Sequence, residues 1–383
     1  MTGRVYFDWN ATAPLRVEAR EAMIAAMAVA GNPSSIHAEG RAARALVEKA
    51  RGQLAAAVGC KPSEVIFTSG ATEAASVLRN VPEGHAVLVD PTAHDCLWAQ
   101  VRGAGGSPQS VPQSVTQSVT QSVTLAMGLA NNETGIVTLP PEKSDGKWPW
   151  HGVKADWLLL DVVQALGRVP FSFAWSGADM ALVSAHKFGG PKGVGALILR
   201  DGVDVSPIMA GGGQEMGRRA GTENVIGIAG MGAAAAAAVR DLADGVWKRT
   251  EQLRNNLESA LSDPAKGTIS PGMGPGMVND RLPNTLCLIT PGWKGETQVM
   301  QMDLAGFAIS AGSACSSGKV RPSRVLQAMG FDEVAASSAI RVSFGPDAQE
   351  ADVMRFAERW QALREKRPMA EPTVTLRKTG VGR

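Results

Sequence analysis

Two short apolar runs in the middle of the chain end in polar side chains of complementary chemistry. Leu158 to Leu160 leads into Asp161, and Met180 to Val183 leads into Ser184-Ala185-His186-Lys187. In an α/β sheet, ligands gather at the carboxyl ends of the strands. Pyridoxal phosphate (PLP) chemistry needs a lysine amine that binds an aldehyde and a carboxylate that keeps a pyridine nitrogen protonated. Either residue alone would most often be a surface charge, so the hypothesis depends on the pair.

A third polar feature follows another apolar run. Residues 64–68 read as a strand and lead into Ser69-Gly70-Ala71-Thr72. Backbone N–H groups and a hydroxyl at such a turn can bind an anion. An ordinary helix cap by Ser or Thr explains the same residues, so the turn supports a phosphate site without deciding it.

The cysteines point to one candidate nucleophile. The chain has four, Cys60, Cys96, Cys287 and Cys315, and no C-x-x-C pair, which argues against a zinc knuckle or a disulfide framework. A cysteine is usually a small buried apolar residue. Cys315 instead lies in a run of small residues, 310–318, where a thiol would have access and mobility. Three basic residues follow closely and would favour the thiolate: Lys319, Arg321 and Arg324.

The elements that must position these groups alternate along the chain up to about residue 250. Helical spacing of Ala, Leu and Val marks residues 16–30 and 38–58. Short apolar runs span 64–68, 86–89, 125–130, 157–160, 180–183 and 196–199. This alternation predicts an α/β domain with a largely parallel or mixed sheet.

The pattern changes after about residue 250 and predicts a second, smaller α+β domain. We expect helices at 250–261, 296–305 and 348–366, a strand at 285–289 and a loop at 270–279. The expected domains are a large PLP-binding domain over 15–250, a small domain over 1–14 and 251–367 that carries Cys315, and a frayed tail over 368–383.

Composition excludes several other classes of protein. The chain has 383 residues, 44% hydrophobic and 19% charged, with a net charge of +2. Its basic residues are dispersed, which argues against nucleic acid as a partner. Met1 to Asn10 lacks the core of a signal peptide. The apolar stretch Ile226 to Val239 is shorter than the roughly 20 residues of a membrane span. We therefore expect a cytoplasmic protein without membrane contact.

One segment repeats a four-residue unit. Gln109 to Thr124 reads QSVP, QSVT, QSVT, QSVT. Such repetition predicts a flexible insert or a β-prone strip without a function of its own.

The motifs together resemble those of the cysteine desulfurases in the class V aminotransferase family, a branch of the fold-type I PLP enzymes. They follow one another along nearly the whole chain: DWNATAP (8–14), GNPSSIH (31–37), FTSGATEA (67–74), NNETG (131–135), DVVQ (161–164), SAHKFGGPKGVGAL (184–197), GGGQEMGRRAGTEN (211–224), SAGSACSSG (310–318) and IRVSFG (340–345). The resemblance implies a large domain with a mostly parallel sheet flanked by helices, plus a smaller α+β domain.

The resemblance also implies roles at a cofactor site. Lys187 would bind PLP covalently and later move the Cα proton, and Asp161 would pair with the ring nitrogen. Gln164 and Asn132 would hydrogen-bond near the phenolic oxygen of the ring, and His94 would stack on its face. Four residues would hold the phosphate: Ala71, Thr72, Ser184 and His186.

Further implied roles concern the substrate and a second subunit. Thr222 would reach the phosphate of a neighbouring subunit, which implies a homodimer with shared active sites. Arg341, with Asn32 helping, would bind the carboxylate of L-cysteine through a bidentate fork. Cys315 would take the sulfur as a persulfide and leave L-alanine.

Several alternatives stay open. The sulfur acceptor would be an iron–sulfur scaffold, a tRNA thiolation enzyme or a cofactor biosynthesis protein. Rival activities are selenocysteine lyase, cysteine sulfinate desulfinase and plain class V aminotransferase, and a non-catalytic scaffold is a further reading. The chain departs from the family pattern at Ala185, at 217–221, and where the QSVT repeat stands in place of a strand and a helix.

Overall fold

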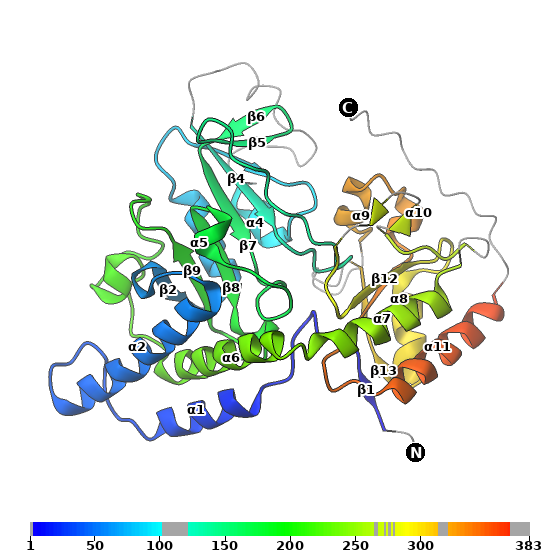
Figure 1. Ribbon diagram of the computed structural model, residues 1–383, viewed down its shortest axis with the longest axis horizontal. Helices are drawn as coiled ribbons and strands as arrows, with labels where there is room; N and C mark the ends of the chain where they lie inside the picture. The colour runs from blue at the N-terminus through cyan, green and yellow to red at the C-terminus, as the bar shows by residue number, and fades with distance from the viewer. Residues whose placement is uncertain are drawn as a thin grey trace. The chain divides into compact units, whose positions relative to one another are not determined.

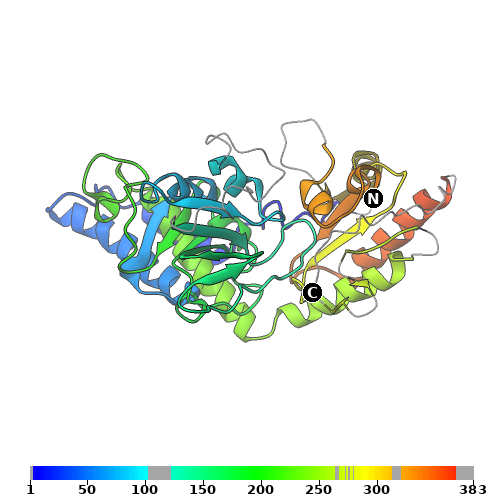
Figure 2. The same cartoon turned by 90° about the horizontal axis from the view of Figure 1, so that it is seen from above.

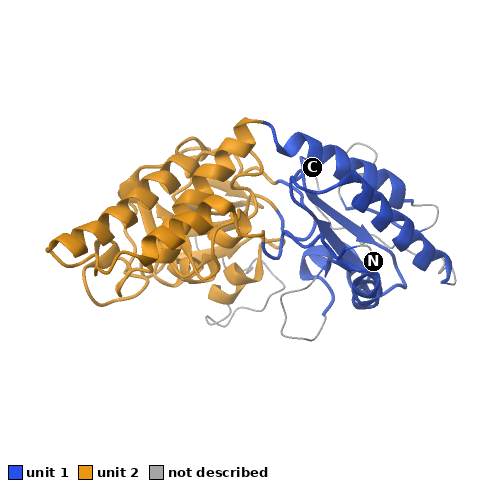
Figure 3. Ribbon diagram, turned by 90° about the horizontal axis from the view of Figure 1, so that it is seen from below, with its two compact units in different colours: residues 1–12, 131–137, 245–383 blue, residues 13–130, 138–244 orange. Residues whose placement is uncertain are grey.

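A computed structural model describes residues 3–101, 122–263, 267–271, 273–274, 277–278, 280–312 and 321–367. Cys315, the tail over 368–383 and the QSVT repeat up to residue 121 lie outside the described residues. The chain forms two compact units, shown in Figure 3. Unit 1 comprises residues 1–12, 131–137 and 245–383, and unit 2 comprises 13–130 and 138–244. The domain boundaries expected from the sequence stay a prediction.

Unit 2 is built on a six-stranded sheet with the order β2-β9-β8-β7-β4-β3, labelled in Figure 1. Its strands are β2 (Val65–Thr68), β3 (Ala86–Val89), β4 (Val123–Gly128), β7 (Trp157–Asp161), β8 (Met180–Ser184) and β9 (Gly195–Leu199). Strands β3, β4, β7 and β8 are parallel, whereas β9 is antiparallel to both β8 and β2. The expected mixed, mostly parallel sheet is confirmed.

Three long helices of unit 2 pack together. They are α1 (Val17–Met27), α2 (Ala38–Val58) and α6 (Val225–Ala243), and α6 lies against both of the others (Figures 1 and 2). The close approach depends on small residues, because a Cβ added to Gly232 of α6 would stand 2.6 Å from Ala50 Cα of α2. Helix α2 begins where His37 accepts the N–H of Gly40 and ends at the left-handed Gly59.

Helix α6 is longer than the apolar stretch that marked it in the sequence. With 19 residues it is, within the described part of the chain, the one helix long and apolar enough to cross a membrane by length and composition. More than half of its apolar window is buried inside unit 2, and the buried core helix of a packed protein passes the same test. Its contacts with α1 and α2 account for its apolar character.

Side chains take the hydrogen bonds along the outer edge of β2. Arg51 donates to the Val65 carbonyl over 2.7 Å. Glu215 accepts from the Phe67 N–H over 2.9 Å, and Glu73 accepts from the Ser69 N–H over 2.8 Å. Alternate residues of an edge strand present their backbone groups to the same side, so these side chains cover an edge that would otherwise be open to pairing.

Unit 1 contains a three-stranded antiparallel sheet with the order β12-β15-β14. Its strands are β12 (Thr285–Ile289), β15 (Ala339–Ser343) and β14 (Ser310–Ala311), and its main helices are α7 (Trp247–Leu261), α8 (Gly295–Leu304) and α11 (Glu350–Glu365). A parallel pair joins β1 (Val5–Tyr6) to β13 (Phe307–Ala308). Aromatic side chains fill the core: Phe7, Trp293, Phe307, Phe344, Phe356 and Trp360.

The smaller elements complete the two units. In unit 2 they are η1 (Pro62–Glu64), α3 (Ala71–Ala74), η2 (Ala75–Arg79), α4 (Asp95–Val101), β5 (Trp148–Trp150), β6 (Val153–Ala155), α5 (Phe173–Ser176), η4 (Ala185–Lys187) and η5 (Gln214–Gly217). In unit 1 they are β10 (Met273–Gly274), β11 (Met277–Val278), α9 (Arg324–Ala328) and α10 (Glu333–Ala336).

One expected loop contains strands. Residues 270–279 include β10 and β11, which pair antiparallel. Each strand spans two residues, which is too short for an alternating apolar pattern to appear in the sequence.

Candidate active site

The candidate site of unit 2 begins at the carboxyl ends of two neighbouring parallel strands. Asp161 is the last residue of β7, and Ser184 is the last residue of β8. The strands pair with Asp161 opposite Leu182, so their ends meet at the same edge of the sheet. The one-turn helix η4 follows β8 at once and carries His186 and Lys187. The topology thus brings together Asp161, Ser184, His186 and Lys187, as their sequence positions predict.

Asp161 is a buried carboxylate with basic neighbours. Its Oδ1 accepts the N–H of Val163 over 2.9 Å. Burial raises the pKa of Asp161, and the charges of His94 and Lys187 oppose that rise. A carboxylate in such a place is best stabilised by a protonated partner. The setting fits the pyridine nitrogen of PLP, which must be protonated to accept electrons.

His94 lies beside Asp161 and has a defined donor and acceptor arrangement. The N–H of Cys96 donates to His94 Nδ1 over 3.1 Å. In this contact Nδ1 is the acceptor, so Nε2 is the ring nitrogen that can carry a proton.

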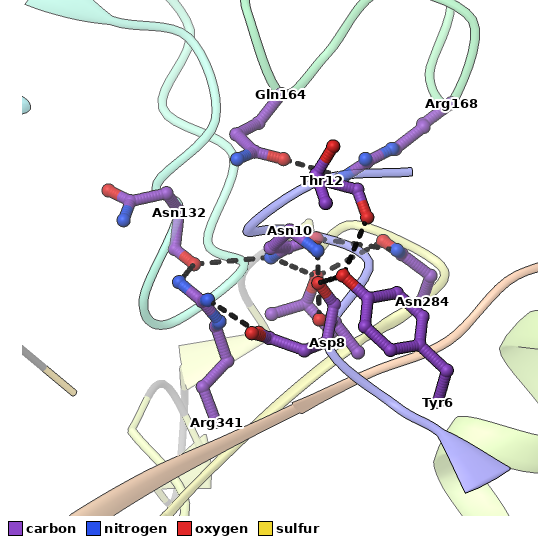
Figure 4. Close-up of polar contacts among 11 residues, drawn as sticks. Tyr6, Asp8, Asn10, Thr12, Asn132, Gln164, Arg168, Asn284 and Arg341 are labelled. Carbon is purple, nitrogen blue, oxygen red and sulfur yellow. Dashed lines mark hydrogen bonds and ion pairs between the residues drawn. The ribbon is translucent and has the colours of Figure 1, made fainter. Parts of the chain in front are cut away.

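Arg168 is a site residue that the sequence did not indicate. Its side chain is buried, with Nη1 donating to Gln164 Oε1 over 2.6 Å and Nη2 donating to the Lys187 carbonyl over 2.7 Å. Figure 4 shows the contact between Arg168 and Gln164. Because the amide oxygen of Gln164 faces Arg168, its NH₂ group is the part that can donate to a ring oxygen. The spacing of four residues between Gln164 and Arg168 is the one sequence signal of this contact.

His186 is held in its neutral form. Burial and the nearby positive charges of Lys187, Lys192 and Arg168 lower the pKa of His186 to about 4. A neutral imidazole has one donor and one acceptor nitrogen. It can donate one hydrogen bond to a phosphate oxygen without adding a charge.

The phosphate residues Ala71 and Thr72 open the short helix α3 directly after the turn at Ser69 and Gly70. Gly195 of β9 approaches this turn so closely that an added Cβ would lie 2.6 Å from Gly70 Cα. The neighbouring strand must therefore have glycine at this position. Glu73 closes the turn by accepting the Ser69 N–H.

Thr222 and Asn32 lie in exposed loops of unit 2. The side chain of Asn32 makes a local contact, in which its Oδ1 accepts the Ser34 N–H over 2.9 Å. Thr222 follows a loop in which Glu215 and Met216 adopt positive φ values of 47° and 58°. Their roles toward a substrate or a second subunit stay predictions.

Arg341 and Asn132 contact each other in unit 1, as Figure 4 shows. Arg341 Nη1 donates to the backbone carbonyl of Asn132 over 3.1 Å, and the Asn132 side chain points away from this contact. Arg341 Nη2 pairs with Asp8 Oδ1 over 2.9 Å. Arg341 lies in the central strand β15 and its side chain is 4% exposed, so it is not a charged residue on the exposed edge of the sheet.

The Nε nitrogen of the Arg341 guanidinium is left as a donor for a ligand. This nitrogen is buried and has no hydrogen-bond partner among the described residues. A bidentate fork on a carboxylate uses two neighbouring N–H groups of this kind. The sequence predicted a role for Arg341, whereas its partner Asp8 stood in the DWNATAP motif without an assigned role.

Cys315 lies outside the described residues, but the chain on either side of it is anchored. The N–H of Gly312 donates to the Ala339 carbonyl, and the N–H of Ser323 donates to the Ala336 carbonyl, each over 3.1 Å. The Ser323 side chain also bonds Glu133.

Comparisons with known proteins find a matching family and similar sequences. The family model described as Aminotransferase class-V matches residues 5–356. A cysteine desulfurase of Cereibacter sphaeroides is 37% identical over 93% of this chain and 94% of the relative. An IscS-like cysteine desulfurase of Mycobacterium tuberculosis is 34% identical over 91% and 93%.

Solved structures give the same result for the fold. A NifS-like protein superposes with a TM-score of 0.79 at 31% identity and covers 94% of this chain and 99% of its own. A NifS-like protein of Rickettsia africae superposes with a TM-score of 0.78 at 27% identity, over the same shares of the two chains.

Proposed function

Because the chain belongs to the class-V aminotransferase family, we infer that it is a PLP-dependent cysteine desulfurase, which takes sulfur from L-cysteine and leaves L-alanine. The observation that carries this conclusion is a match to cysteine desulfurases that runs through both units of the chain. The fold-type I architecture, with its mixed and mostly parallel sheet, agrees with this assignment.

The residues of unit 2 fit the cofactor. Bound PLP supplies an electron sink for the carbon from which the substrate proton leaves. We propose that Lys187 tethers it and moves that proton, while Asp161 holds the ring nitrogen protonated. Gln164 donates its NH₂ to the phenolic oxygen, assisted by Asn132, and His94 stacks on the ring. The phosphate is held by Ala71, Thr72, Ser184 and His186.

The substrate carboxylate is assigned to Arg341, with Asn32 as a helper. Asp8 already pairs with Arg341 Nη2, so the incoming carboxylate shares or replaces this partner. An exchange of one carboxylate for another keeps the buried guanidinium paired throughout, which avoids the cost of an isolated buried charge.

We propose that Cys315 receives the sulfur. Its thiolate forms an S–S bond with the sulfur of cysteine while the C–S bond breaks, and the carbon fragment takes a proton and leaves as L-alanine. The persulfide then passes to an acceptor, for which an iron–sulfur cluster scaffold is the proposed partner. The proposed location is the cytoplasm.

The direct test is turnover of the purified full-length protein. Incubation with L-cysteine and a thiol reductant should release alanine and sulfide in equal amounts. Selenocysteine and cysteine sulfinate, tested in parallel, separate the lyase and desulfinase alternatives. Amino transfer that needs a keto acid and yields no sulfide would instead identify a plain aminotransferase.

We further propose a homodimer in which Thr222 of each subunit completes the phosphate site of the other. A heterodimer of Lys187→Ala and Thr222→Ala chains then contains one site with both native residues. Mixing the two variants after unfolding and refolding should restore activity above that of either homodimer. Activity that never exceeds the sum of the two variants would contradict shared sites.

A further inference from the structure

The turn before the proposed phosphate residues depends on one carboxylate. Glu73 Oε2 accepts the N–H of Ser69 over 2.8 Å and so closes the turn that presents Ala71 and Thr72. Ser69 is exposed, so this bond fixes the local shape of the turn and does not shield it from water. Glu73 therefore stabilises the shape of the turn through its side chain.

The same carboxylate creates an electrostatic problem. Glu73 follows Thr72 directly in the chain, and a phosphomonoester carries about −1.5 to −2 charges at neutral pH. Like charges close together in a half-buried site disfavour each other. A phosphate held at Ala71 and Thr72 would thus be repelled by the group that shapes its turn.

Arg219 is placed to offset that charge. Its Nε pairs with Glu73 Oε1 over 2.8 Å, and its Nη2 donates to Glu73 Oε2 over 3.4 Å. Both side chains are largely covered, with 20% of Arg219 and 16% of Glu73 exposed. Arg219 lies three residues before Thr222, in the loop that is held to β2 by Glu215.

We propose that Arg219 is a positioning residue for the cofactor phosphate, acting through Glu73: it neutralises the carboxylate that closes the 69–73 turn and so permits a dianion beside it. This inference rests on the proposed phosphate site at Ala71 and Thr72.

The charge states of the pair agree with this role. Burial raises the pKa of Glu73, but its hydrogen bonds to Arg219 and Ser69 outweigh that effect and leave the pKa below its usual value. The bond to Glu73 raises the pKa of Arg219, and the charges of Glu215 and Glu223 act in the same direction. Both groups are therefore ionised at neutral pH. Removal of Arg219 takes its positive charge away from Glu73, Glu215 and Glu223.

The test compares two forms of the cofactor. Full-length protein stripped with hydroxylamine is titrated with PLP and with pyridoxal, which lacks the phosphate. Arg219→Met should weaken PLP binding on the order of tenfold, as expected for about 1.4 kcal/mol. Pyridoxal binding should change by less than about twofold, because the effect requires the phosphate charge.

The second variant decides the mechanism. Gln at position 73 keeps an acceptor for the Ser69 N–H but carries no charge. The double variant Glu73→Gln with Arg219→Met should therefore regain most of the lost PLP affinity. If the double variant binds PLP as weakly as Arg219→Met alone, Arg219 acts in some other way and the inference is wrong.

Three controls complete the design. Arg218→Met removes the same charge from the neighbouring residue and should leave the ratio of PLP to pyridoxal affinity unchanged, and Arg219→Lys should stay near the native ratio. Thr72→Ala tests the phosphate site itself. If Thr72→Ala does not lower the ratio, the proposed phosphate site is wrong. If it does and Arg219→Met does not, only the role of Arg219 is refuted.

Discussion

Lys187 is the side chain whose replacement has the most specific consequence. It follows β8 in η4, and its charge acts on the buried Asp161. Lys187→Ala should abolish the covalent link to PLP, so that borohydride reduction traps no cofactor on the protein. Lys192→Ala is the matched control, since it removes an exposed lysine from the same loop. Cofactor still trapped in Lys187→Ala, located by peptide mapping, would identify a different lysine.

His186 should make the cofactor-free protein sensitive to acid. Its pKa is lowered to about 4 in the folded chain, mainly by burial, against about 6.5 when unfolded. The unfolded chain therefore binds more protons between these values, so stability is fully present above pH 6.5 and falls as the pH drops toward 4. The His186→Gln variant should lose less stability over this range. Urea unfolding at pH 7.5 and pH 5 checks the prediction, and equal losses in both proteins would contradict it.

The sequence predicted the residues that lie at strand ends but not those that act through them. Asp161 and Lys187 could be found because Asp161 directly follows an apolar run and Lys187 comes four residues after another. Arg168 and Asp8 were given no role, because the contacts of Arg168 with Lys187 and of Asp8 with Arg341 depend on where the chain folds back. The contact between Asp8 and Arg341 joins residues 333 positions apart, and no local pattern encodes such a pairing.

The outer edge of β2 is covered by contacts that join several secondary-structure elements. Arg51 of α2 donates from Nη1 and Nη2 to the two carboxylate oxygens of Glu215, and both distances are below 3 Å. The side chains of Arg51 and Glu215 are 9% and 1% exposed. Arg51 also donates to Val65 and lies 4.9 Å from the ring centroid of Phe67. The pair therefore joins a helix, an edge strand and the 211–222 loop.

Arg51→Met should destabilise unit 2 strongly. The substitution leaves Glu215 buried without its counter-ion, and breaking a buried pair costs about 3–5 kcal/mol. Arg44→Met, on the exposed face of the same helix, should change stability by less than about 0.5 kcal/mol. Urea unfolding measures both variants. A loss with Arg51→Met no larger than with Arg44→Met would show that the pair does not hold this edge.

Helices and strands could be predicted where they are long enough for a periodic apolar pattern to appear in the sequence. Residues 38–58 were expected as a helix and form α2 over the same span. The strand at 285–289 was likewise predicted with its observed bounds. The two-residue strands β10 and β11 were missed, since two residues carry no periodicity.

At the scale of the whole molecule, each unit is assembled from distant segments. Residues 131–137 belong to unit 1, although the chain on both sides of them belongs to unit 2. The backbone of Gly135 accepts the N–H of Leu282, and Val137 donates to the carbonyl of Asp280. No domain boundary was predicted at these residues, because composition does not change there.

Burial sets the acidity of the three cysteines in the described part of the chain and leads to the last prediction. Burial raises the pKa of Cys60 to about 12 and raises the pKa of Cys96 and of Cys287 further still. At pH 8 these thiols are protonated almost completely, and a thiol must ionise before it can attack sulfur. The described part of the chain therefore offers no cysteine suited to accept a persulfide, which agrees with the role proposed for Cys315.

Cys315→Ala should accordingly retain the absorbance of bound cofactor but lose at least about 10² of the rate of sulfide release from L-cysteine, since the replacement removes the attacking nucleophile. Cys60→Ala, which deletes the least buried of the other thiols, should keep both properties. Mass spectrometry after a single turnover should find one added sulfur, on the peptide that contains Cys315. Sulfur found on the Cys60 peptide, or full sulfide release by Cys315→Ala, would mean that a buried thiol becomes reactive during turnover. In that case the burial of Cys60, Cys96 and Cys287 would be a property of the resting molecule alone.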